Sequence, residues 1–85
     1  MPYIPKKERM GIDSVIADLM PEIKDVGQLN YTLTKIILDY VSTIGLNYKN
    51  VNGVIGVLEC AKLEMYRRVV AAYENKKKKQ NGDVY

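Results

Sequence analysis

The chain has 85 residues, with 13 Lys and Arg against 10 Asp and Glu, one Cys, seven Tyr and no His, Phe or Trp. A chain of this length forms a single domain that buries only about 60% of its unfolded surface, so it is marginally stable alone. One cysteine excludes an internal disulfide and a cysteine zinc cluster. Without His the usual general base near neutral pH is missing, so the composition argues against an enzyme.

Positive charge is concentrated at the two ends of the chain. Residues 6–9 hold three basic side chains and residues 76–79 are all lysine, whereas residues 10–75 hold six basic and eight acidic side chains. A nucleic-acid binder usually presents a basic stripe on a structured face, and the body of this chain is acidic. Nucleic-acid binding through the basic termini is therefore only the third of the functions that we consider.

Hydropathy indicates a protein without membrane contact. No run of about 18 apolar residues is present, and the first ten residues lack the apolar core of a signal peptide. We therefore expect a soluble protein in the cytoplasm.

The N-terminal segment contains Pro2 and Pro5, which disfavour helix in the residues before them. Residues 1–11 are predicted to form an extended arm. Helical periodicity then runs from about Ile12 to Val26. Pro21 lies inside this segment and removes a backbone donor, so we expect either a kink or a break there.

Capping residues set the expected bounds of the second helix. Gly27 is predicted to end the first helix, and Asn30 is a favourable N-cap for the next one. The apolar stripe continues to Ile44, and Gly45 is predicted to end the helix. Leu46 suits the apolar contact of a Schellman-type cap.

The third helix is predicted to be the longest. It begins at Asn47 or Asn50 and ends at Tyr73 or Lys76, which gives a length of about 40 Å. Residues 76–85 are predicted to form a basic tail.

The apolar side chains of this third helix span about 200° of a helical wheel, whereas a surface helix needs only about 100°. Gly53 and Gly56 fit either close approach of another helix or frayed first turns. We therefore predict an all-α fold, with a three-helix domain over residues 12–75 assembled as a homo-oligomer. The simplest assembly is a two-fold dimer with antiparallel long helices, although the number of subunits stays open.

Two charged side chains interrupt the apolar arc of the third helix. Lys62 lies in its middle, and Glu59 precedes it by three residues. They either form a salt bridge with each other or belong to a polar cluster around a ligand. Tyr can stack on bases, and Arg and Lys can bind phosphate. The candidate ligand-binding residues are Tyr31, Tyr48, Glu59, Lys62, Tyr66, Arg67 and Arg68.

No residue pattern points to catalysis, a metal or a cofactor. Ser14 and Ser42 have no His partner for a hydrolase triad. The acidic residues of the first helix are spaced by five, four and three positions, so they do not share one face. Cys60 lies off the apolar stripe and is interpreted as a small filler.

Three segments resemble a known family. They are VIGVLECAKLE followed by YRRVV at residues 54–70, MPYIP at the start and NGDVY at the end. The chain resembles a family of small uncharacterised proteins encoded by tailed bacteriophages and prophages. The resemblance covers nearly the whole chain, implies no established activity or site residues, and indicates that the NGDVY tail is native.

The resemblance narrows the expected role. Short phage proteins often bind host components, and one class sequesters nucleotide second messengers of bacterial immunity in pockets between subunits. By that analogy we expect a non-enzymatic phage protein that sequesters a nucleotide-type signal in the host cytoplasm. The alternative is a protein-interaction module that docks on a host or phage protein.

Overall fold

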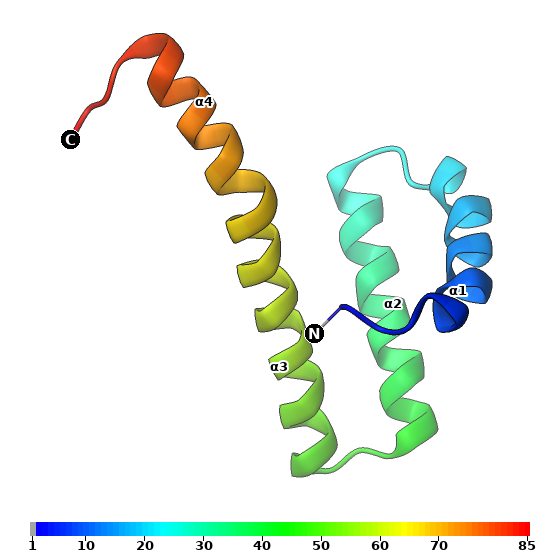
Figure 1. Ribbon diagram of the computed structural model, residues 1–85. Coiled ribbons are helices and arrows are strands. Elements are labelled where there is room, and N and C mark those ends of the chain that lie inside the picture. Colours follow the sequence, from blue (N-terminus) through cyan, green and yellow to red (C-terminus); the bar gives the residue numbers. More distant parts are fainter. Residues whose placement is uncertain (1) are drawn as a thin grey trace.

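The structure is a computed structural model that describes residues 2–85 (Figure 1). The described residues are 83% helical and contain no strand, which confirms the predicted all-α fold with three helices. Helix α1 spans Lys6–Leu19, the 3₁₀ turn η1 spans Met20–Glu22, and α2 spans Val26–Ile44. The third helix is continuous over 34 residues. It consists of α3 (Tyr48–Met65), the π-helical turn η2 (Tyr66–Val70) and α4 (Ala71–Asn81).

The N-terminal arm is shorter than predicted. Helix α1 begins at Lys6 rather than at residue 12, with Pro5 at the N-cap position and the Glu8 N–H donating to the Pro5 carbonyl at 2.9 Å. Proline restricts itself and the residue before it, but not the residues that follow. Lys, Glu, Arg and Met are good helix formers, so the helix starts directly after Pro5. Met1 of the predicted arm lies outside the described residues.

Pro21 produces the break that was one of the two expected outcomes. Helix α1 ends at Leu19, Pro21 lies in the following 3₁₀ turn, and Ile23 is extended with φ −99°. The missing proline N–H therefore falls where no helical hydrogen bond is needed.

The start of α2 corrects two predictions. Asp25, not Asn30, is the N-cap: its carboxylate accepts from the Gln28 N–H at 2.7 Å, and the Gln28 side chain accepts from the Lys24 N–H at 2.6 Å. These bonds satisfy one free N–H of the first turn of α2 and the N–H of the residue before the N-cap. Gly27 and Asn30 therefore lie inside α2, and Gly27 does not end a helix.

The turn between α2 and α3 is held by side-chain caps. Gly45 ends α2 as predicted, with φ 102°. Its ψ of 143° is outside the left-handed helical region, so the predicted Schellman contact does not form and Leu46 is exposed. Asn47 caps α3 by accepting from the Asn50 N–H at 2.9 Å. The Asn50 side chain in turn donates to the carbonyls of Ile44 (3.1 Å) and Gly45 (2.8 Å).

Asn50→Ala is expected to lower the free energy of unfolding by about 1–2 kcal/mol, because two hydrogen bonds to the last carbonyls of α2 are lost. Urea denaturation followed by circular dichroism measures this change. Asn75→Ala, on the exposed side of α4, is the matched control. Equal stability of the two variants would show that water replaces the Asn50 contacts without cost.

The long helix extends further than predicted. The chain meets no helix breaker until Gly82, where φ is 90°, so Lys76–Lys79 lie in the helix rather than in a tail. Positive charge near a helix C-terminus is favourable because it faces the negative end of the helix dipole. Only residues 82–85 continue beyond the helix.

The helices form an open V (Figure 1). Helices α2 and α3 pack near the turn that joins them, and the α4 half of the long helix projects away from the rest. The Cα atoms of α1 stay more than 8 Å from those of α2 and α3. The radius of gyration is 16.6 Å, against about 12 Å for a compact domain of this length.

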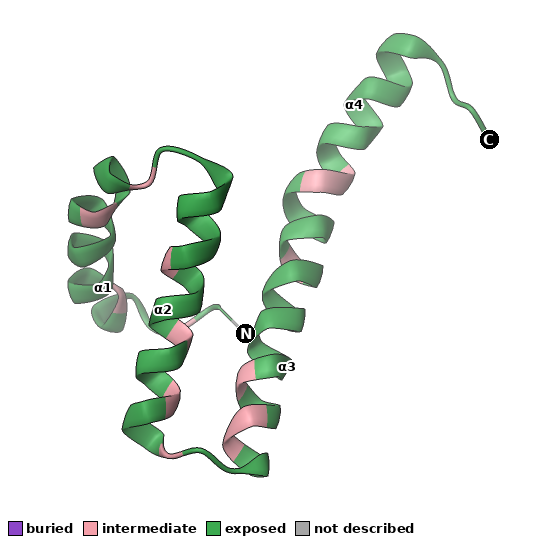
Figure 2. Cartoon of the chain, turned by 180° about the vertical axis from the view of Figure 1, so that it is seen from behind, coloured by how far each residue is buried: buried purple, intermediate pink, exposed green. Residues whose placement is uncertain are grey.

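None of the side chains that the structure describes is fully buried (Figure 2). Gly53 and Gly56 lie well inside α3, so the alternative of frayed first turns is wrong. A Cβ added at either glycine would meet no other atom of the chain within 4 Å, so no helix of the same chain approaches closely at these two positions.

Candidate functional site

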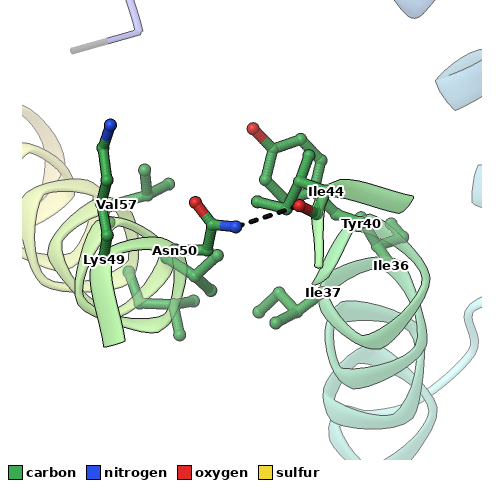
Figure 3. A pocket seen from close by; sticks show the side chains of 10 residues that line it. Ile36, Ile37, Tyr40, Ile44, Lys49, Asn50 and Val57 are labelled. Atoms are coloured by element: carbon green, nitrogen blue, oxygen red, sulfur yellow. Dashed lines mark hydrogen bonds between the residues drawn. The ribbon is translucent and has the colours of Figure 1, made fainter. Parts of the chain in front are cut away.

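An apolar groove lies between α2 and α3 (Figure 3). Its volume is about 500 Å³, and Ile37 of α2 and Asn50 of α3 project into the space between the two helices. Its lining residues are Ile36, Ile37, Tyr40, Ile44, Lys49, Asn50, Gly53, Val54, Val57 and Leu58. Apart from the Lys49 ammonium, the Tyr40 hydroxyl and the bonded Asn50 amide, the lining is apolar. Such a surface suits hydrophobic packing rather than chemistry.

A polar cluster lies where the N-terminal arm meets the long helix. The Tyr3 hydroxyl donates to Glu64 Oε1 at 2.6 Å, and Arg67 Nη2 donates to the same oxygen at 2.6 Å. Tyr3 and Glu64 are 61 positions apart in sequence, so this contact ties the arm to the third helix. We call Tyr3, Glu64 and Arg67 the arm cluster.

The arm cluster changes the proton affinity of its own members. The hydrogen bonds from Arg67 and Tyr3 lower the pKa of Glu64, because both stabilise the carboxylate. The hydrogen bond to Glu64 raises the pKa of Tyr3, because the carboxylate favours the protonated hydroxyl. The positive charge of Arg68 favours the ionised form of both groups and so acts to lower the pKa of Tyr3 and of Glu64.

The arm is expected to stay docked only between acid and alkaline limits. A lowered carboxyl pKa gives stability that is present above the ordinary value of 4.5 and lost as the pH falls through the folded value. A raised Tyr3 pKa gives stability that is present below 10.0 and lost as the pH rises through the folded value. Chemical shifts of the Tyr3 ring measured by NMR across this range report the docking.

Tyr3→Phe is the control for this experiment, because it keeps the ring and removes the hydroxyl. In that variant the shifts of the residue-3 ring should lose their link to Glu64 titration. An unchanged titration would show that the arm cluster does not persist in solution.

The structure places the predicted ligand-binding residues in separate regions. Lys62 Nζ and Glu59 Oε1 form an ion pair at 3.0 Å, and both side chains are exposed. Tyr31 lies on α2, and Tyr48 begins α3. Tyr48 and Tyr66 are 18 residues apart on one helix, or about 27 Å along its axis, so one chain does not bring them together.

The last three predicted residues share one unusual element. Tyr66, Arg67 and Arg68 lie in η2, a π-helical turn, and such turns occur frequently at functional sites.

The sequence analysis did not predict two members of the arm cluster, Tyr3 and Glu64. The spacing of Glu64 and Arg67 by three positions is typical of a helix-face ion pair, so it could have been recognised. Nothing in the sequence pointed to Tyr3.

Within residues 2–85, no group of three or more acidic or Cys side chains is arranged to hold a metal ion. Nor does any helix in that range combine the length and the apolar character that crossing a bilayer requires.

Comparison with known proteins assigns a family. A family model described as "Domain of unknown function (DUF6899)" matches residues 1–84. The chain belongs to this family. A search of curated proteins and a search of solved structures found no match. Membership of DUF6899 therefore accounts for nearly the whole chain and brings no assigned activity to the groove or to the arm cluster.

Proposed function

We propose that the protein is a non-enzymatic binding protein that works as a homo-oligomer. The observation that carries this proposal is the lack of any fully buried side chain between residues 2 and 85. The hydrophobic effect is the dominant favourable contribution to folding, and an isolated chain of this shape gains little from it. In the proposed homo-oligomer, other copies of the chain bury the exposed apolar side chains.

The exposed area supports the same proposal. The chain exposes 7851 Å², whereas a folded monomer of 9.7 kDa exposes about 5,100 Å². The excess of roughly 2,700 Å² per chain, about 5,400 Å² for two copies, lies at the upper end of the total area that obligate homo-oligomer interfaces bury.

Sedimentation equilibrium tests the proposal. We expect an oligomer at micromolar concentration, with helical circular dichroism that decreases on dilution because folding and association are coupled. A monomer that keeps full helicity at all concentrations would overturn it.

A second candidate function is the sequestration of a nucleotide-type immune signal in a pocket between subunits. Tyr66, Arg67 and Arg68 in the π-helical turn favour it, because they combine an aromatic ring with two guanidinium groups beside the arm. The resemblance of residues 54–70 to phage and prophage proteins supports a phage origin and action in the host cytoplasm. Docking on a host or phage protein through the apolar groove is the alternative.

Calorimetry against a panel of cyclic nucleotides and ADP-ribose derivatives tests this second function. Arg68→Ala should remove the heat of binding while the oligomer persists. Lys35→Ala, which removes a cation from α2, is the matched control. The absence of heat with every compound would exclude this function and leave the protein-interaction alternative.

A further inference from the structure

Helix α3 carries a row of side chains with coiled-coil spacing, most of them exposed. Val51, Ile55, Leu58, Lys62 and Met65 follow one another at intervals of four, three, four and three residues. We call this row the α3 seam. Ile55 is 59% exposed and Met65 is 60% exposed, whereas Val51 is half-buried and Leu58 also lines the groove, so the seam is open chiefly at Ile55, Lys62 and Met65. Intervals of this kind keep one stripe of a helix facing a partner helix.

The residue types fit the same geometry. In heptad terms Ile55 and Lys62 occupy a positions, and Val51, Leu58 and Met65 occupy d positions. A single Lys at an a position specifies register and the number of strands at a cost in stability. The α3 seam therefore has the pattern of a helix that packs against another helix.

We propose that the α3 seams of two copies pair antiparallel across a two-fold axis. This inference rests on the proposed homo-oligomer and names the surface that forms it. The second copy is the expected occupant because the excess exposed area of two chains lies at the upper end of the total that such interfaces bury. An interface related by a two-fold axis also uses the same patch on both chains, as a single seam requires.

Charge selects the antiparallel orientation. Parallel pairing would place the two runs Lys76–Lys79 side by side, where like charges repel. Antiparallel pairing carries each run toward the turn between α2 and α3 of the other copy. The last turn of α2 has no basic residue, and its carbonyls form the negative end of a helix dipole; Lys49, in the first turn of α3, is the single cation near this turn, against four in the facing run of a parallel pair.

The register follows from the need to pair a with d positions. When Ile55 faces Met65 of the second copy, Lys62 faces Leu58 of that copy, and Glu59 of that copy is its neighbour. The Lys62–Glu59 ion pair of each chain, 3.0 Å long, is then exchanged for a pair across the axis, so the dimer keeps two such pairs. The charges at the centre of the seam are neutralised in this register.

Disulfide crosslinking tests the pairing. In a Cys60→Ser background, the double variant Ile55→Cys with Met65→Cys should form covalent dimers under mild oxidation. Within one chain the two positions are about 15 Å apart along the helix, too far for a disulfide. Each single variant should remain uncrosslinked, because antiparallel pairing separates identical positions. Sedimentation of the reduced double variant shows whether it keeps the oligomeric state of the parent protein.

A spin-label measurement gives a second readout that leaves the α3 seam intact. Labels at Asn75→Cys, again with Cys60→Ser, should lie about 45 Å apart in an antiparallel pair, since residue 75 of each copy is opposite position 45 of the other. Short label distances, or crosslinking of the single Ile55→Cys variant, would overturn the proposal in favour of parallel pairing. An oligomer that shows neither crosslinks nor the long distance overturns the pairing alone. A monomer overturns both the pairing and the proposed homo-oligomer.

Discussion

Ile55→Asp is expected to abolish the oligomer and, with it, most of the helical circular dichroism. Ile55 occupies the middle of the α3 seam, 59% exposed in the single chain and covered in the proposed pair. The substitution removes a buried aliphatic side chain and places a carboxylate in an apolar contact, twice in each dimer. A loss of about 4 kcal/mol corresponds to a roughly thousand-fold weaker association.

The loss of helicity follows from the shape of the chain. A subunit without any fully buried side chain in residues 2–85 has little apolar packing to offset its conformational entropy. Sedimentation velocity and far-ultraviolet circular dichroism at the same concentration measure the two effects together.

Cys60→Asp is the matched control for Ile55→Asp. It introduces the same charge on the same helix, but position 60 lies on the opposite side of α3 from the α3 seam in heptad terms. This control should keep the oligomer. If both variants dissociate, added negative charge rather than loss of the seam is responsible, and the position of the interface is wrong.

Local capping chemistry made part of the fold predictable. Gly45 ends α2 and Asn47 caps α3, as their residue types indicated. The start of α2 was predicted wrongly because two capping residues competed. Asp25 prevails over Asn30 since it caps the Gln28 N–H while the Gln28 side chain binds the preceding Lys24 N–H, and it adds one further turn to the helix.

Long-range contacts were beyond the reach of the sequence pattern. Tyr3 meets Glu64 across 61 positions, and a lone tyrosine in an arm has no periodicity that would indicate a partner. The π-helical turn at Tyr66–Val70 was likewise missed, because hydrophobic periodicity assumes a regular helix on both sides. Arg67 was therefore predicted as a site residue from its residue type, but its partners in the arm cluster, Tyr3 and Glu64, were not predicted.

The wide apolar arc was the most informative sequence feature, and the structure explains why. One part of α3 contributes Val54 and Val57 to the groove facing α2, while Ile55 and Met65 point along a separate exposed row. Two surfaces on one helix, each of ordinary width, add up to the broad arc. Only the groove is formed within the chain, and the second surface is the one that the proposed association would cover.

Lys62→Leu is expected to raise the thermal unfolding midpoint by about 10 °C. Lys62 is the one charged member of the α3 seam, and its side chain is 67% exposed in the single chain. Covering it in the proposed pair costs desolvation that a leucine avoids, while leucine adds about 2 kcal/mol of apolar burial. For a domain of this size each kcal/mol shifts the midpoint by about 4–8 °C.

The same substitution should reduce specificity. A polar a position fixes register and the number of strands, so a seam that is apolar throughout is expected to form additional species larger than the parent oligomer. Differential scanning calorimetry and sedimentation velocity on one sample separate the two effects. Lys62→Gln, which keeps a polar group, should leave the distribution of species unchanged. A lower midpoint for Lys62→Leu would instead show that loss of the ion pair between Lys62 and Glu59 outweighs the added apolar burial.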